Sequence, residues 1–184
     1  IYVGSFKNNK KDGNGTFTYT NGDIYVGEYK NDMMDGNGTF KYSNGNVYKG
    51  EYRHNKWDGK GSFTYLQGDK YDGSWKDGNM DGPGVFSYSN GDKYDGSWQD
   101  DYRNGFGTLT IANGDIFSGE WLDGMLTGAG KYQYHSGDTY EGEFFNGRYN
   151  GEGTFTFLNG DVYTGNWKYD KMDGIGRMNY SNGN

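Results

Sequence analysis

Rings and polar side chains alternate along the chain in a pattern that returns every 23 residues without insertion or deletion. In the second copy, residues 24–30 place Tyr25, Gly27 and Tyr29 at every second position, and residues 38–42 continue the alternation. A period of two predicts β-strands with rings and glycine on one face and mainly polar residues on the other. Each copy is therefore predicted to form two strands.

The period never slips, and eight copies account for all 184 residues. A strict period of this length is typical of stacked repeat arrays, in which each unit packs only on its neighbours. We expect one array with repeats at residues 2–24, 25–47, 48–70, 71–93, 94–116, 117–139, 140–162 and 163–184.

Glycine and asparagine mark two turns in each copy. Asn21-Gly22 and its equivalents separate consecutive copies, and such a pair between alternating segments predicts a type I′ hairpin turn. A second column, which includes Asp32 and Gly78, holds only Gly, Asn or Asp, the residues that tolerate positive φ. We expect a left-handed turn at this column, within a loop over residues 31–36.

Four glycine columns are invariant, and two of them, the columns of Gly27 and Gly38, share the face of the rings. Rings on one strand are therefore expected to lie over glycines of the next strand and to bend the sheet. The fold class predicted is all-β. We expect an elongated, single-layer antiparallel sheet built from eight consecutive 23-residue β-hairpins.

The combination of Tyr-x-Gly-x-Trp/Phe, Gly-x-Gly-x-Phe-x-Tyr and Asn-Gly-Asp at this period resembles the MORN (membrane occupation and recognition nexus) repeat over the whole chain. The resemblance implies a stack of β-hairpins. Such arrays occur in cytoskeletal scaffolds, in ciliary and junctional proteins, and beside the catalytic domains of lipid kinases and a lysine methyltransferase. The fifth copy departs most, because Leu109 and Ile111 replace rings and Phe106 lies between its glycines.

The charge balance disfavours two kinds of partner. The net charge is −7, with 18 basic residues dispersed among 25 acidic ones. Anionic lipid and nucleic acid both require clustered basic residues, so lipid is disfavoured and nucleic acid is not expected. The chain has no cysteine, which excludes disulfides and thiolate metal sites and mildly favours a reducing compartment.

Residues that could carry chemistry do not form a repeated set. His54 and His135 occupy non-equivalent positions, and we expect both to be solvated rather than metal ligands. The recurrent Asp after Asn-Gly supplies too few oxygens for calcium and is interpreted as a turn residue. We therefore predict no catalytic residues, no metal and no cofactor.

Large apolar side chains concentrate in repeats 4 to 8, and tryptophan is the residue most enriched in binding hot spots. The loop column that includes Met34 and Trp57 forms either a rim for a partner or an anchor for its loop. We expect a helix or peptide of a protein partner, or a second copy of the chain, to bind the ring face. The candidate residues are Trp75, Trp98, Phe106, Leu109, Ile111, Trp121, Leu122, Phe144, Phe145 and Trp167.

These features favour a non-catalytic scaffold in the cytoplasm, associated with the cytoskeleton or a membrane. The alternative is a regulatory or targeting domain of a larger enzyme of the lipid kinase or methyltransferase type, and the third interpretation is phospholipid or carbohydrate binding. Because the chain begins at Ile1 and follows the repeat boundaries, we expect it to be a segment of a longer protein.

Overall fold

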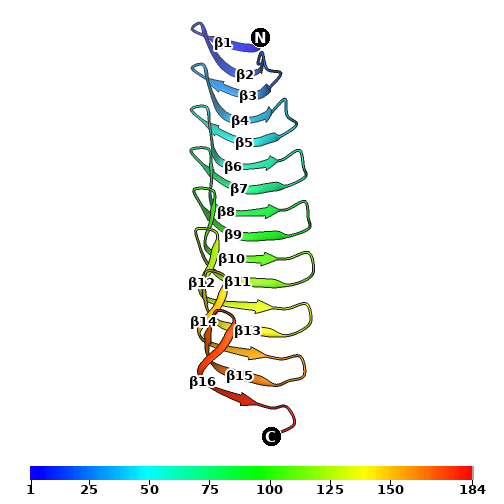
Figure 1. Cartoon of the computed structure of the whole chain (residues 1–184). Coiled ribbons are helices and arrows are strands. Elements are labelled where there is room, and N and C mark those ends of the chain that lie inside the picture. The colour runs from blue at the N-terminus through cyan, green and yellow to red at the C-terminus, as the bar shows by residue number, and fades with distance from the viewer. Residues whose placement is uncertain (184) are drawn as a thin grey trace. The chain divides into compact units, whose positions relative to one another are not determined.

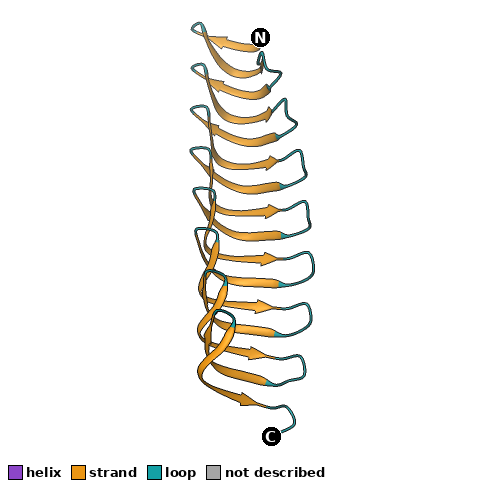
Figure 2. Ribbon diagram, in the orientation of Figure 1, coloured by secondary structure: helices purple, strands orange, loops and turns teal. Residues whose placement is uncertain are grey.

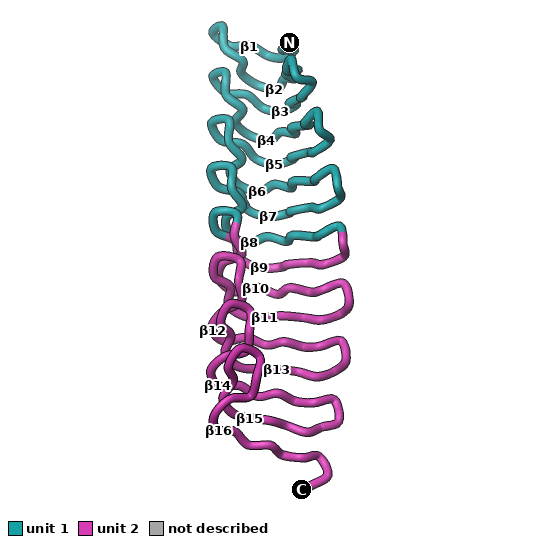
Figure 3. Tube along the Cα trace, in the orientation of Figure 1, with its two compact units in different colours: residues 1–89, 99–101 teal, residues 90–98, 102–184 magenta. Residues whose placement is uncertain are grey.

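The computed structural model of the chain describes residues 1–183, and residue 184, the last of the predicted eighth repeat, lies outside them. The described residues form sixteen strands and no helix, and thus no helix long and apolar enough to cross a membrane (Figures 1 and 2). Contacts divide the chain into two compact units, residues 1–89 with 99–101 and residues 90–98 with 102–184 (Figure 3).

Within each unit, strands that follow one another in sequence lie side by side and antiparallel, as the alternating pattern predicts. Unit 1 contains β1 (Tyr2–Lys7), β2 (Lys10–Thr18), β3 (Ile24–Lys30), β4 (Met33–Lys41), β5 (Val47–Arg53), β6 (Lys56–Thr64), β7 (Lys70–Lys76) and β8 (Asn79–Ser87). Unit 2 contains β9 (Lys93–Gln99) except its last residue, β10 (Tyr102–Thr110), β11 (Ile116–Leu122), β12 (Met125–Gln133), β13 (Thr139–Phe145), β14 (Arg148–Thr156), β15 (Val162–Lys168) and β16 (Lys171–Asn179). The predicted all-β antiparallel fold is confirmed.

The glycines of neighbouring strands pair with one another beneath a tyrosine ring. Gly27 of β3 faces Gly38 of β4, and it also faces Gly15 of β2. The ring of Tyr25 crosses this pair and donates from its hydroxyl to the carbonyl of Glu28 at 3.0 Å. A Cβ on Gly38 would lie 2.5 Å from a ring carbon of Tyr25, so only glycine fits. The expected packing of rings on glycines is confirmed.

The tight hairpin turn of each repeat lies at the column of Asp32, which was predicted to be part of a longer loop. Asn31 and Asp32 have φ values of 50° and 71°, the type I′ geometry, in which both central residues are left-handed. The left-handed turn predicted at Asp32 is confirmed. The loop predicted over residues 31–36 is wrong, because β4 begins at Met33.

A bulge in the second strand of each hairpin accommodates the residues that were assigned to the loop. In β4, Met34 faces Tyr29 and Gly38 faces Gly27, so three residues lie opposite one residue of β3. Gly36 lies in this bulge with a φ of 107°. The invariant glycine of this column is therefore needed for a bulge inside the sheet.

The Asn-Gly turn is a three-residue loop, and the predicted type I′ geometry is wrong. Within residues 20–22 only Gly22 has a positive φ, 91°. The Gly22 amide donates to the Tyr19 carbonyl at 3.2 Å, and the Tyr19 amide donates to the Asp23 carbonyl at 2.9 Å. This is a type I turn followed by a glycine bulge.

Candidate functional site

The rings within each unit bury one another on a single face of the sheet. Tyr71 is 0% exposed and lies edge to face with Trp75, with their centroids 5.0 Å apart. The indole N–H of Trp75 donates to the carbonyl of Gly61 at 2.9 Å, and Trp121 and Trp167 make the equivalent bond in unit 2. In each unit these tryptophans belong to the core, and residues 1–183 supply no second layer over the sheet.

The loop column covers the first ring of its own repeat. Trp57 stacks on Tyr48 with centroids 4.5 Å apart and planes inclined by 10°, and Tyr149 stacks on Tyr140 at 3.7 Å. Leu126, in the same column, is 2% exposed. The buried members of this column therefore anchor their own loops. Only members with a partly exposed side chain are available to contact a partner.

The ten candidate partner residues lie on two opposite faces. Leu109 and Ile111 are half-buried among the rings, whereas Phe106 pairs with Glu120 on the polar face. The buried candidates, each 6% exposed or less, are Trp75, Trp98, Trp121, Phe144 and Trp167. The exposed candidates are Phe106, Leu122 and Phe145, at 66%, 55% and 50%. The arrangement does not bring the buried and exposed candidates together on one surface.

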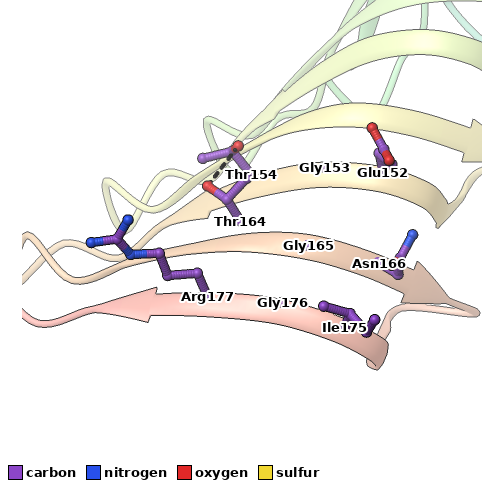
Figure 4. Close-up of a pocket in the computed structure, with 9 residues that line it drawn as sticks. All are labelled: Glu152, Gly153, Thr154, Thr164, Gly165, Asn166, Ile175, Gly176 and Arg177. Carbon is purple, nitrogen blue, oxygen red and sulfur yellow. Dashed lines mark hydrogen bonds between the residues drawn. The ribbon is translucent and has the colours of Figure 1, made fainter.

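A shallow groove on the polar face of unit 2 follows the paired glycines. Its floor includes Gly153, Gly165 and Gly176, which pair in register from β14 to β16. Figure 4 shows side chains on both sides of this floor, Thr154, Thr164 and Arg177 on one side and Glu152, Asn166 and Ile175 on the other. A similar stretch between β10 and β13 is lined by Phe106 and Ala129.

The aspartates that follow Asn-Gly connect the loops of consecutive repeats. Asp23 accepts a hydrogen bond from the amide of Ser43 at 2.7 Å, and Asp92 accepts one from the amide of Ala112 at 2.8 Å. These bonds hold the pKa of Asp23 below its usual value, with the Ser43 amide as the main cause. The column is therefore more than a set of turn residues, because each carboxylate joins two loops.

Asp115 carries an additional cluster that the sequence reasoning missed. It is 8% exposed and accepts hydrogen bonds from the Tyr132 hydroxyl at 2.6 Å and from the His135 amide at 2.8 Å. The His135 Nδ1 also lies 2.9 Å from Asp115 Oδ1. These contacts, led by the Tyr132 hydroxyl, hold the pKa of Asp115 well below its usual range.

Both histidine side chains are mainly exposed as expected, His54 at 68% and His135 at 61%, but His135 also contacts the buried Asp115. The sequence did carry a signal for this cluster, in the two columns to which its residues belong. Most repeats have phenylalanine at the column of Tyr132, and several have serine at the column of His135. The sixth repeat alone combines a tyrosine and a histidine at these two columns.

Calcium is expected to leave the melting temperature unchanged. Among residues 1–183 no three acidic, His or Cys side chains converge as a metal site requires, and the recurrent aspartates are occupied by main-chain amides. Thermal melts in millimolar calcium and in chelator provide the measurement. A clear calcium-dependent rise in melting temperature would contradict the interpretation, because specific binding to the folded state must stabilise it.

Comparison with protein families identifies the repeat. The family model described as MORN repeat matches residues 2–24, 25–47, 48–70, 71–93, 94–116, 117–139, 140–162 and 163–184. The resemblance drawn from the sequence is confirmed. None of the curated proteins compared matches the chain in sequence.

Solved structures with a similar fold include the TCP domain of SAS-4 (dCPAP) from Drosophila melanogaster, determined in complex with a proline-rich motif of Ana2 (dSTIL). It is 17% identical with a TM-score of 0.51, and the match covers 85% of this chain and 86% of that domain. The TCP10 domain of Danio rerio CPAP is 13% identical with a TM-score of 0.31, covering 91% and 89% of the two chains. The first of these supports the fold alone.

Proposed function

This chain belongs to the MORN repeat family, and we propose that it is a non-catalytic scaffold that binds a protein partner or a second copy of itself. The carboxylate with the most perturbed pKa, Asp115, supports a structural role, because its oxygens are engaged in bonds that hold two loops together. We propose that it acts in the cytoplasm, associated with the cytoskeleton or a membrane.

One observation carries the proposal: apolar side chains stand exposed on the polar face of unit 2. Leu122 faces Met125 across the β11–β12 hairpin, and both are about half exposed, at 55% and 47%. Phe145 occupies the same column one repeat later and is 50% exposed. The same column in unit 1 carries basic residues such as Lys30. Exposed apolar clusters of this kind mark interaction sites on monomers.

The nature of the partner has independent support in the comparison. The Drosophila domain of similar fold was determined with a proline-rich motif of another protein. A protein segment is therefore the partner class we propose, and self-association through the same exposed residues is the second form of the same function.

Replacing Leu122 and Phe145 together by glutamate is expected to abolish partner capture or self-association without unfolding the chain. Two carboxylates in a desolvated contact cost far more than the apolar area they replace, whereas both positions are open in the free protein. Light scattering measures the mass in solution, and binding to a purified, identified partner measures capture.

The matched control is Val3→Glu with Val26→Glu. These positions are also apolar and exposed, at 71% and 47%, and they add the same charge to unit 1. If the control variant loses association while the Leu122 and Phe145 variant retains it, the functional surface lies in unit 1 and the assignment fails.

A further inference from the structure

We infer that a cleft on the ring face of unit 1 binds an arginine side chain of the protein partner. The inference rests on the proposed protein-binding function, but it uses a different surface from the exposed residues of unit 2. The cleft is lined by Met34, Phe40, Tyr42, Tyr52 and Trp57, with Asn55 and Gly78 from turns and Lys56 from the start of β6.

The cleft has a volume of about 310 Å³ and combines rings with one unpaired polar group. Tyr52 is 4% exposed, and its hydroxyl has no hydrogen-bond partner among the described residues. Burial raises the pKa of Tyr52 and the Trp57 indole opposes that rise, but the indole does not form a hydrogen bond of good geometry with the hydroxyl. A buried hydroxyl without a partner is costly, so a guest that supplies one gains binding free energy.

The chain itself places cations in the equivalent position of other repeats. The Lys11 ammonium lies over the rings of Phe17 and Tyr29, at 4.6 and 5.2 Å from their centroids. These rings correspond, 23 residues on, to Phe40 and Tyr52 of the cleft. The packing of this fold therefore accepts a cation against these two ring columns.

Arg103 shows how a guanidinium fits the same column in unit 2. Its central carbon lies 4.4 Å from the Trp121 ring centroid, and its Nη2 donates to the Gly124 carbonyl at 3.0 Å. Asn55, which lines the cleft, occupies the position of Gly124. In the second repeat the column of Lys11 and Arg103 holds neutral Met34, so the chain places no cation against the rings of the cleft.

The charged groups at and near the cleft are paired, so their charges do not oppose a cationic guest. Lys56 at the rim is paired with Asp77 at 2.9 Å. Asp58 lies 3.5 Å from Arg53, and Glu51 accepts from the Lys60 amide on the polar face of the sheet. Arginine is preferred over lysine because its planar guanidinium stacks on rings and still donates in its plane. The Tyr52 oxygen is fully buried in the free chain, so it accepts from one of those donors once the guest displaces the side chains that cover it.

The test compares two capped Gly-Ser peptides that differ at one residue, arginine in one and its neutral isostere citrulline in the other. Binding to the whole chain is followed by proton–nitrogen NMR at the Trp57 indole N–H. The arginine peptide is expected to bind about fivefold to thirtyfold more tightly, the range that a desolvated cation–π contact supplies. Equal affinity of the two peptides, or no binding of the arginine peptide, overturns the inference.

The chain offers matched variants for the site. Met34→Lys introduces the cation that Lys11 supplies in the first repeat, so the arginine peptide is expected to lose binding. Met34→Leu introduces the residue that Leu126 supplies in the sixth repeat, so binding is expected to persist. Melting temperatures verify that both variants fold, and unchanged binding to folded Met34→Lys overturns the inference.

The two proposals fail separately. If the arginine peptide does not bind while partner capture still depends on Leu122 and Phe145, the cleft assignment is wrong and the scaffold function stands. If the peptide binds at the cleft while neither capture nor self-association depends on unit 2, the arginine site stands and the surface assigned to unit 2 is wrong.

Discussion

Replacing Gly84 with alanine is expected to destabilise the chain by about 3 kcal/mol, the upper end of the usual cost of overpacking. Gly84 pairs with Gly73 of the neighbouring strand, under the ring of Tyr71. An added Cβ would lie 2.5 Å from a ring carbon and closer still to the tyrosine hydroxyl. The ring cannot retreat, because its hydroxyl donates to the Ser74 carbonyl at 3.0 Å and the residue is fully buried.

Gly130→Ala is the matched control for this prediction. Gly130 occupies the same column, but the first ring of its repeat is Phe117, which has no hydroxyl. A Cβ there would meet the Ser118 carbonyl oxygen at 3.0 Å and the edge of the Phe144 ring at 3.1 Å. We expect a cost of about 1 kcal/mol in urea denaturation.

A double variant identifies the cause. Combining Gly84→Ala with Tyr71→Phe removes the hydroxyl, the atom nearest to the added Cβ. The double variant should therefore be destabilised by less than the sum of the losses in the two single variants. If the two alanine variants are equally destabilised, or if the double variant is fully additive, the tyrosine hydroxyl is not the reason that this column is glycine.

The period and the faces of the sheet could be predicted from the sequence because both depend on local alternation. Tyr25 and Tyr29 are buried while Val26 is 47% exposed, as the period of two predicts. The alternation holds even in the fifth repeat, where Phe106 is exposed and Leu109 is half-buried.

The two turns of each repeat were assigned in reverse because both contain residues that tolerate positive φ. Asn21-Gly22 has the composition of a type I′ turn, yet Asn31 and Asp32 adopt that geometry. The difference arises in the bulge around Gly36, where the register between the paired strands shifts. The residue composition of a turn does not predict such a shift, because the shift depends on how the two strands pair across the hairpin.

The candidate site was the hardest part to predict, because exposure depends on how far the sheet bends. The sequence placed Trp98 and Trp121 on the ring face, but it could not show that neighbouring rings leave them 6% and 5% exposed. The bonds of the aspartate column were missed for a related reason. Asp115 meets His135 across 20 residues, a distance that no local turn rule covers.

Replacing Asp115 with asparagine is expected to destabilise the chain by about 2 to 3 kcal/mol at pH 7, the cost of disrupting hydrogen bonds to a largely buried charge. The asparagine side chain keeps one oxygen that can accept from the His135 amide. Its NH2 group would replace the oxygen to which the Tyr132 hydroxyl and the Asn113 side chain now donate, so donors would face donors. Amide hydrogen exchange at His135 reports the local effect, and thermal melts report the effect on the unit.

Asp92→Asn is the control, because asparagine already serves this column in another repeat. Asn46 accepts the Leu66 amide at 2.9 Å, and Asp92 accepts the Ala112 amide without a tyrosine hydroxyl or a histidine ring beside it. We expect a cost below about 1 kcal/mol, the usual range for one exposed hydrogen bond. Equal costs at Asp92 and Asp115 would show that the additional cluster contributes nothing.

The pH dependence gives the same prediction a second readout. The pKa of Asp115 is lowered in the folded state, first by the Tyr132 hydroxyl, so its ionised form stabilises the fold at every pH above the unfolded pKa of about 4. That contribution is lost as the pH falls from there through the folded pKa, whereas asparagine does not titrate. The stability difference between the natural chain and Asp115→Asn should therefore shrink as the pH falls below about 4. A difference that grows as the pH falls below about 4 would mean that the neutral carboxyl is the bound form and that the hydrogen bonds run in the opposite sense.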